Sequence, residues 1–222
     1  MRNQIRGVAL PVAIVLLMVT GTMGAMALQA TVVAAEGKVE IRRSAEGSWE
    51  AVAAGEVVPV GATISTSFNA SAVLAIGESR VEVAALTRMR IDELASNNGV
   101  ERSEIGLPVG RIEASVRGND GGRAEFEVRS PIATASVRGT DFSFDGANLS
   151  VAEGLVILAN RFSEIVTVAQ GESSSASGEG PPPDPVDAAD DAARVTVSLG
   201  PEGELPELRS RTGGITINWA IQ

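Results

Sequence analysis

The stretch Ala133–Gly146, ATASVRGTDFSFDG, sets the strongest limit on the fold of this 222-residue chain. Small or apolar residues stand at odd positions up to Val137, and phenylalanines then stand at even positions, Phe142 and Phe144. The side chains of a strand alternate between two faces, so a strand that buries one face throughout needs an extra residue where this parity changes. Glycine reaches the left-handed backbone angles that several types of β-bulge use. The pattern therefore predicts a buried strand with a β-bulge at or next to Gly139.

Short segments of alternating polarity continue from Val32 to about Val168, and turns that contain glycine separate them. β-Branched residues are frequent in these segments, and stretches with the 3.6-residue period of a helix are few. The sequence therefore predicts an all-β domain, in which the polar stretch Asp92–Arg102 forms a loop. The segment Gly118–Gly122 is expected to be the turn of a hairpin. The expected strands lie around Val39–Ile41, Ile64–Phe68, Ala72–Ile76, Val81–Val83, Met89–Ile91, Ile112–Val116 and Phe126–Val128.

Two segments far apart in the chain are similar to each other. Ala35–Ile41 (AEGKVEI) resembles Ala152–Leu158 (AEGLVIL), and a Gly-Glu pair follows each of them, at Gly55–Glu56 and Gly171–Glu172. This similarity predicts one strand-turn-strand unit that is used twice. The alternative is chance, because Glu-Gly turns are common.

Residues 1–27 are predicted to be a secretory signal peptide. Arg2 and Arg6 make a basic start, Val8–Val19 is an apolar run, and Ala25–Ala27 fits a small-x-small cleavage site. The mature protein is then expected in the bacterial periplasm or outside the cell. The alternative is an uncleaved inner-membrane anchor over residues 8–28, because Val8–Leu28 is just long enough to span a bilayer. Contact with a membrane is expected only in that case.

The remaining chain divides into three parts by composition. Residues 28–173 are expected to form the β domain. Residues 174–194 are rich in serine, proline and aspartate, including Pro181–Pro183, so they are expected to be a disordered linker that cannot bury a core. Residues 195–222 form a C-terminal tail, in which apolar residues alternate over Val195–Leu199 and Ile215–Trp219 and indicate short strands.

Several classes of function need residue types that this chain lacks. It contains no cysteine, histidine or tyrosine, which excludes disulfides, cysteine nucleophiles, Ser-His pairs and zinc sites built on cysteine or histidine. The net charge is −10 and no basic cluster occurs, so nucleic acid is not an expected partner. The aspartates of Asp184–Asp191 do not have the spacing of an EF-hand loop. No catalytic residue, metal or cofactor is therefore predicted, and the chain is expected not to be an enzyme.

Arg138 is the most informative charged residue. It belongs to Ala135–Gly139 (ASVRG), which is identical to Ala114–Gly118, and only the second copy continues as a strand. If the bulge turns Arg138 inward, its guanidinium needs an anion, and Glu153 is the expected partner in a bidentate pair. The alternative is a solvated arginine on an open face. A buried pair also predicts that Arg138→Ala lowers the melting temperature substantially.

The run Val137–Phe142 (VRGTDF), followed by Val151–Val156 (VAEGLV) and later by Gly171–Glu172, resembles the FecR domain, a periplasmic module named for a bacterial iron-transport regulator. The upstream pattern falls in the same order, at Gly37–Val39, Trp49, Gly55–Glu56, Gly61, Ile64–Thr66, Ala72–Leu74 and Gly77–Ser79. The resemblance covers roughly Val32–Ser173 and implies a jelly-roll-like double-sheet β-sandwich. The motif residues are expected to serve architecture, and they are Arg138, Gly139, Thr140, Phe142, Glu153 and Gly154.

Regulators that this chain resembles carry a cytoplasmic sigma-factor-binding domain ahead of their membrane span, whereas only residues 1–7 precede the apolar run here. The resemblance therefore implies an exported, stand-alone domain that does not bind a sigma factor directly. The function hypothesis is a non-enzymatic domain for protein interaction or signal sensing in the cell envelope, through exposed strand edges or the surface around Arg138. The alternative is a cell-wall or polysaccharide-binding module that uses Trp49 or Trp219 as a stacking surface.

Overall fold

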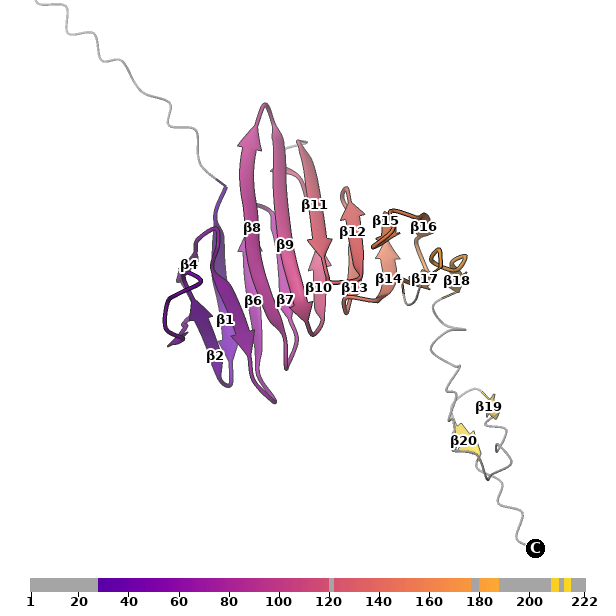
Figure 1. Cartoon of the computed structure of the whole chain (residues 1–222), viewed down its shortest axis with the longest axis horizontal. Coiled ribbons are helices and arrows are strands. Elements are labelled where there is room, and N and C mark those ends of the chain that lie inside the picture. The colour runs from indigo at the N-terminus through magenta and orange to yellow at the C-terminus, as the bar shows by residue number, and fades with distance from the viewer. Residues whose placement is uncertain (1–27, 120–121, 177–179, 188–208, 212–213, 217–222) are drawn as a thin grey trace, which may run out of the picture.

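Two large β-sheets form a sandwich in the computed structural model (Figure 1). The structure describes residues 28–119, 122–176, 180–187, 209–211 and 214–216. The sandwich confirms the predicted all-β, double-sheet fold. The predicted signal-peptide helix, by contrast, falls on residues outside the described ranges. Among the residues described, no helix has the length and hydropathy needed to cross a bilayer.

Sheet A has nine strands in the order β18-β17-β14-β13-β10-β7-β6-β1-β4. Its strands are β1 (Ala30–Glu36), β4 (Val57–Val58), β6 (Ser71–Ile76), β7 (Ser79–Val83), β10 (Ile112–Ser115), β13 (Asp141–Phe144), β14 (Asn148–Glu153), β17 (Glu172–Ser175) and β18 (Val186–Asp187).

Sheet B also has nine strands, in the order β16-β15-β12-β11-β9-β8-β5-β2-β3. Its strands are β2 (Val39–Arg42), β3 (Glu50–Ala51), β5 (Thr63–Thr66), β8 (Arg88–Asn97), β9 (Val100–Val109), β11 (Arg123–Arg129), β12 (Ala133–Val137), β15 (Leu155–Asn160) and β16 (Ile165–Ala169). All pairs within the two sheets are antiparallel except β9 and β11, which are parallel. A separate two-stranded sheet joins β19 (Arg209–Arg211) and β20 (Gly214–Thr216).

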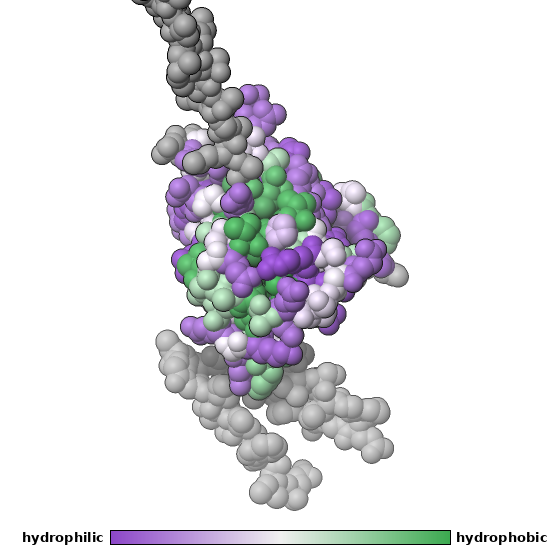
Figure 2. Space-filling view, turned by 90° about the vertical axis from the view of Figure 1, so that its left-hand side faces the viewer, coloured by the Kyte–Doolittle hydropathy of each residue, from purple (hydrophilic) through white to green (hydrophobic). Residues whose placement is uncertain are grey.

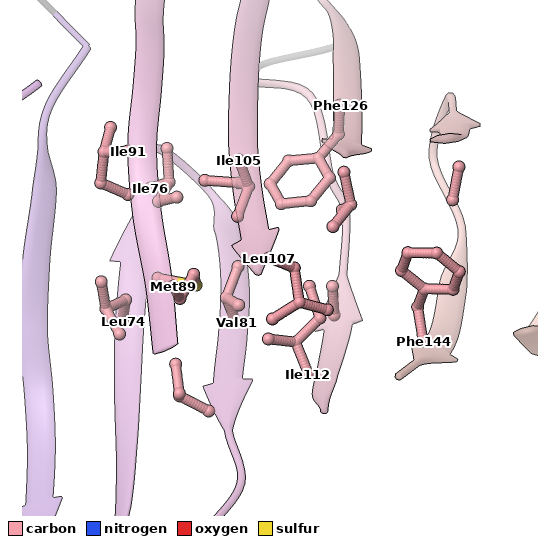
Figure 3. Close-up of a cluster of buried hydrophobic side chains, with 14 of the residues drawn as sticks. Leu74, Ile76, Val81, Met89, Ile91, Ile105, Leu107, Ile112, Phe126 and Phe144 are labelled. Atoms are coloured by element: carbon pink, nitrogen blue, oxygen red, sulfur yellow. The ribbon is translucent and has the colours of Figure 1, made fainter. Parts of the chain in front are cut away.

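The core lies between the sheets and follows the period-two alternation of the strands. In β6, for example, Ala72, Leu74 and Ile76 are buried while the residues between them are half-exposed. Side chains from both layers meet in the middle, as Figure 3 shows for Leu74 and Met89. The hydrophobic effect that stabilises this fold therefore comes from the inward faces of short alternating strands. The largest fully buried side chains are Phe144, Ile41, Ile64, Leu74, Ile76, Met89, Ile91, Ile105, Leu107, Ile112, Leu149 and Leu158.

The parity change in Ala133–Gly146 marks a crossing between the sheets. β12 ends at Val137 in sheet B and β13 begins at Asp141 in sheet A, so the two buried faces belong to opposite layers. The predicted bulge within one strand at Gly139 is therefore wrong, although Gly139 does have a left-handed φ of 68°. A register shift lies next to the motif, in the pairing of β13 with β14, where Asp141 pairs with Glu153 and Phe142 with Val151. Ala152 is the extra residue there.

Two further expectations about connections are wrong for a related reason. The predicted hairpin around Gly118–Gly122 is a link between sheets, because β10 lies in sheet A and β11 lies in sheet B. The expected loop Asp92–Arg102 is instead a long hairpin of β8 and β9. Its turn is Asn98–Gly99, with φ values of 50° and 76°, and Asn-Gly is a strong signal for a two-residue hairpin turn.

The predicted repeat is confirmed by the topology. β1 and β4 pair in sheet A while β2 and β3 pair in sheet B. In the same way β14 and β17 pair in sheet A while β15 and β16 pair in sheet B. In both units a glycine with left-handed φ, Gly37 or Gly154, connects the first strand to the second. The two units lie at opposite ends of the sandwich (Figure 1).

The two ends of the sandwich differ in structure. At the β2–β4 end, apolar side chains gather between hydrophilic flanks (Figure 2), and Val33, Val57 and Val60 are exposed there. At the other end, β18 extends sheet A within the predicted linker, and Ser174 Oγ donates to the carbonyl of Pro183 at 2.8 Å.

Candidate binding surface

The outer face of sheet B carries a hollow of about 650 Å³. Strands β9, β11, β12 and β15 form its floor, so we name it the sheet B groove. Most of the side chains that line it point outward, because residues alternate between the core and the outer face, while Ser103, Phe126 and Val137 among them are buried. Its lining residues are Arg102, Ser103, Glu104, Glu125, Phe126, Glu127, Arg129, Ser136, Val137, Arg138, Leu155 and Ile157.

Arginines and glutamates alternate across the groove. Glu125 accepts from Arg102 Nη2 at 2.7 Å and from Arg138 Nη2 at 3.1 Å. Arg129 pairs with Glu127 on its own strand and with Glu104 on β9, the latter at 3.4 Å. Hydrogen bonding to Arg102 lowers the pKa of Glu125 below its ordinary value, so the carboxylate stays charged at neutral pH. Three arginines and three glutamates thus leave the groove without net charge.

An apolar border closes the groove on its β15 side. Leu155 and Ile157 point outward and are 49% and 42% exposed, and Ile165 on β16 is 67% exposed. Apolar side chains beside paired charges are typical of surfaces that bind proteins.

Arg138 lies on this outer face and is not buried. Its side chain is 72% exposed and its ion pair is with Glu125 on β11. The predicted inward pair between Arg138 and Glu153 is therefore wrong. Because β12 ends at Val137, Arg138 no longer follows the alternation of the strand, and its side chain lines the groove.

Arg117, in the first ASVRG copy, makes the contacts that were expected of Arg138. Its Nη1 lies 2.8 Å from Asp141 Oδ1 and its Nη2 lies 3.4 Å from Glu153 Oε2. The pair forms because β10 and β13 are neighbours in sheet A, with Ser115 opposite Asp141. Hydrogen bonding from Arg117 lowers the pKa of Asp141. The sequence holds no signal that separates the two copies, since only the strand order places one of them beside Asp141.

Arg117→Ala is expected to destabilise the protein more than Arg138→Ala does. Arg117→Ala removes the ion pairs with Asp141 and Glu153 and a 2.9 Å hydrogen bond to the carbonyl of Val116. Arg138→Ala removes one exposed ion pair, with Glu125. Because solvent screens a half-exposed pair, we expect a loss of about 1 kcal/mol for Arg117→Ala and a few degrees in melting temperature. Arg138→Ala should melt within about 1 °C of the parent. Thermal unfolding followed by circular dichroism compares the two, and an equal loss would contradict this assignment.

Thr140 ties the crossing between the layers to both sheets. It is fully buried, and its Oγ1 donates to the carbonyl of Leu155 in sheet B at 3.1 Å. Its own carbonyl accepts from the amide of Val116, just after β10, at 2.9 Å. Gly154 packs directly on this segment, because a Cβ there would lie 3.0 Å from Thr140 Oγ1. The motif residues Gly139, Thr140 and Gly154 therefore meet at one point of the fold, as an architectural role requires.

Phe142 joins the layers just beyond the crossing. Its ring meets that of Phe126 edge-to-face, with centroids 6.3 Å apart. Since β13 belongs to sheet A and β11 to sheet B, this aromatic pair bridges the core directly behind the groove. Glu153 is exposed, and its Oε2 lies 3.4 Å from Arg117 Nη2.

The two Gly-Glu pairs have the same local role, which sequence reasoning missed. Glu56 accepts from the amide of Ala53 at 2.9 Å, and Glu172 accepts from the amide of Ala169 at 2.8 Å. Each carboxylate thus satisfies the amide three residues before it, where the chain leaves sheet B for sheet A. The matching spacing of the two pairs could have indicated this role.

Glu101 is a buried acid on β9. It is 9% exposed, and its Oε2 has no hydrogen-bond partner among the described residues. Burial, with a smaller effect from the nearby charge of Glu78, raises the pKa of Glu101. The carboxylate therefore destabilises the folded state at neutral pH.

Glu101→Gln is expected to stabilise the protein at pH 7. An unfolded glutamate loses its proton near pH 4.3, and the folded one at a higher pH, so the folded state binds more protons between the two values. The free energy of unfolding of the parent should therefore fall as pH rises through that window. That of Glu101→Gln should not, because the variant has no carboxyl group at this position. We expect a gain on the order of 1 kcal/mol, or a few degrees, at pH 7. The gain should vanish below pH 4, and Glu46→Gln, at an exposed site, should show none.

The ring of Trp49, the candidate stacking surface for sugars, already has two arginine side chains close to it. The guanidinium carbons of Arg42 and Arg88 lie 5.0 Å and 5.9 Å from its ring centroid. Trp219 lies outside the described residues. Within the described ranges no cluster of three or more acidic side chains could hold a metal ion.

Comparison with known proteins identifies the fold that carries this surface. The profile of the family described as FecR protein matches residues 62–157. This chain contains a FecR domain. The matched part of the FecR domain runs from β5 into β15, so it includes the crossing at Thr140 and every residue that lines the groove. The resemblance expected from the sequence is thus confirmed.

Two crystal structures of a "putative anti-sigma factor" from Parabacteroides distasonis are similar to this chain. They share 19% and 20% sequence identity with this chain, each with a TM-score of 0.46. The alignments cover 59% of this chain and 63% and 62% of those chains. No curated protein sequence matches the chain.

Proposed function

We propose that this FecR domain is a non-enzymatic sensing module that binds a protein of the bacterial cell envelope through the sheet B groove. The observation that carries the proposal is the combination of balanced ion pairs with the apolar border of Leu155 and Ile157. The matched family supports a regulatory role in place of catalysis.

The charges of the groove favour a protein partner. A surface that binds nucleic acid must present unneutralised cations, whereas Arg102 and Arg138 both contact Glu125. Exchange of such ion pairs with a partner gives specificity and faster association, and the exposed leucine and isoleucine supply apolar area. We therefore expect a partner that presents apolar side chains flanked by charges of both signs.

An envelope location is part of the proposal. It rests on the sequence of residues 1–27, with its basic start, apolar run and Ala25–Ala27 site. A cell-wall or polysaccharide ligand is less well supported, because Arg42 and Arg88 occupy the surroundings of Trp49.

Affinity capture from an envelope extract tests the proposal with two matched variants. Ile157→Lys places a charge on the apolar border of the groove, and Glu82→Lys places one on the exposed outer face of sheet A. We expect the parent and Glu82→Lys to retain the same envelope protein, and Ile157→Lys to lose at least about tenfold of it. Equal capture by all three proteins would contradict the role of the groove. Co-sedimentation with purified peptidoglycan distinguishes the cell-wall alternative, and we expect no binding there.

A further inference from the structure

We propose that the free edge of β16 is a dimerisation site, at which a second copy of this chain adds its own β16 in antiparallel orientation. This inference does not depend on the partner of the sheet B groove. It rests on the hydrogen-bonding groups of β16, on the way the chain finishes its other edges, and on the charges at the two ends of the strand.

The amides of Ile165 and Thr167 point away from the sheet. The last pair of the β15–β16 ladder is Ala159 with Ile165. One residue further, Asn160 N donates to the carbonyl of Glu164 at 3.0 Å, which makes the last pair a non-hydrogen-bonded one. Hydrogen-bonded pairs alternate with non-bonded ones along an antiparallel ladder, so Val166 and Val168 are bonded to β15. Ile165, Thr167 and Ala169 therefore face outward, and Ala169 does donate away from β15, to Glu172.

Only some of the outward amides of this edge have a hydrogen-bond partner among the described residues. Glu172 accepts from Ala169 at 2.8 Å, but no hydrogen bond in the described part of the structure reaches the amide of Ile165 or Thr167. Both residues are exposed. An exposed strand edge with unpaired amides is a template for another strand.

The equivalent edge strand of the first repeat is β3, which is shorter and has charged side chains beside it. β3 is only two residues long, and Arg43, just after β2, bonds Glu56 at 2.7 Å and lies 3.7 Å from Glu50 on β3. Short edge strands and charged side chains are devices that prevent edge-to-edge pairing. β16 has five residues, Ile-Val-Thr-Val-Ala, without a charge or a proline. Of these two equivalent edges, the one at β16 is open among the residues that the structure describes.

The free groups of β16 are complementary to themselves. In an antiparallel pair centred on Val166, Ile165 of one copy faces Thr167 of the other, and the reverse. In this register Ile165 and Thr167 of each copy form hydrogen-bonded pairs with Thr167 and Ile165 of the other copy. The amide of Ala169 needs no partner in the second copy, because it already donates to Glu172. The two-fold axis is perpendicular to the sheet, as in an isologous dimer.

Charge at the ends of the strand favours the same arrangement. Arg161 precedes β16 and Glu172 follows it. Antiparallel pairing brings the start of each strand to the end of the other, so Arg161 of each copy approaches Glu172 of its mate. The exposed side chains of Leu155, Ile157 and Ile165 then form an apolar area on both sides of the axis. Both sheet B grooves lie on one face of the joined sheet, which would allow bivalent binding of a partner.

Single cysteines test the register, because the chain contains none of its own. In the proposed pair Val166 faces Val166 of the mate as a non-hydrogen-bonded pair, about 4.5 Å apart at Cα, which suits a disulfide. Val166→Cys is therefore expected to form a reducible dimer under mild oxidation, at least about fivefold faster than Thr167→Cys. Random collision would favour Thr167→Cys, because residue 167 is the more exposed. Equal or faster cross-linking at 167 would overturn the proposal.

The mass of the purified protein supplies the second test. We expect sedimentation velocity to give twice the mass of one chain for the parent, and the mass of one chain for Thr167→Pro and Thr167→Lys. Proline at 167 removes only the outward amide, and lysine keeps the backbone intact in case proline prevents folding. A monomeric parent, or a lysine variant that remains dimeric, would refute the proposal. A monomer with protected amides at 165 and 167 in hydrogen exchange would show that another segment of the same chain covers the edge.

Discussion

Phe144→Ala is expected to be the most destabilising single substitution in the core. The Phe144 side chain is fully buried on β13 and belongs to the hydrophobic core (Figure 3). Truncation removes the favourable burial of the ring and leaves a cavity, which together cost about 3–5 kcal/mol. The melting temperature should therefore fall by roughly 10 °C, as measured by calorimetry or circular dichroism.

Phe68→Ala is the matched control for this loss. The same side chain is removed, but Phe68 is 74% exposed, so little burial is lost. We expect a change within about 0.5 kcal/mol. If the two alanine variants melted together, Phe144 could not be a core residue and the face assigned to β13 would be wrong.

Gly154→Ala is expected to have a comparable effect through backbone strain and steric overlap. Gly154 has a φ of 89°, and a Cβ there would lie 3.0 Å from both Gly139 O and Thr140 Oγ1. A left-handed backbone costs a non-glycine residue on the order of 1–3 kcal/mol, and the contacts with the crossing segment add to it. We expect a total loss of about 3 kcal/mol or more in chemical denaturation.

Gly171→Ala separates the two causes. Gly171 has a similar φ of 80°, but no atom lies within 4 Å of the position that its Cβ would take. This variant should therefore show the backbone strain alone, and should be clearly more stable than Gly154→Ala. Equal losses would mean that the tight packing of Gly154 on Thr140 contributes nothing to stability.

The sequence was sufficient to predict which side chains are buried, but not their partners. Both halves of Ala133–Gly146 bury the predicted faces, with Val137 and Phe142 each 4% exposed. The predicted bulge between them failed because a change of parity has two explanations. Either one strand gains a residue, or the chain passes from one layer to the opposite one. The local pattern is the same in both cases.

The candidate site was predicted in part. Thr140 and Gly154 lie together at the crossing between the sheets, whereas the contact with Glu153 that was expected of Arg138 is made by Arg117. The groove itself could not be foreseen, because Arg102 and Glu125 lie on β9 and β11 while Arg138 follows the end of β12. Their charges look like ordinary solvated positions along the chain, and they become a surface only when β9, β11 and β12 lie side by side.

By itself, the sequence determined the strand class, the buried face of most strands, the repeat and the FecR resemblance. These follow from short-range rules, since alternation and turn chemistry act over a few residues. Only the tertiary structure decided which sheet each strand joins, and hence that Arg117 meets Asp141 while Arg138 faces the groove. Strand pairing is a contact between distant segments, so two identical ASVRG copies acquire different partners from their neighbours in the sheets.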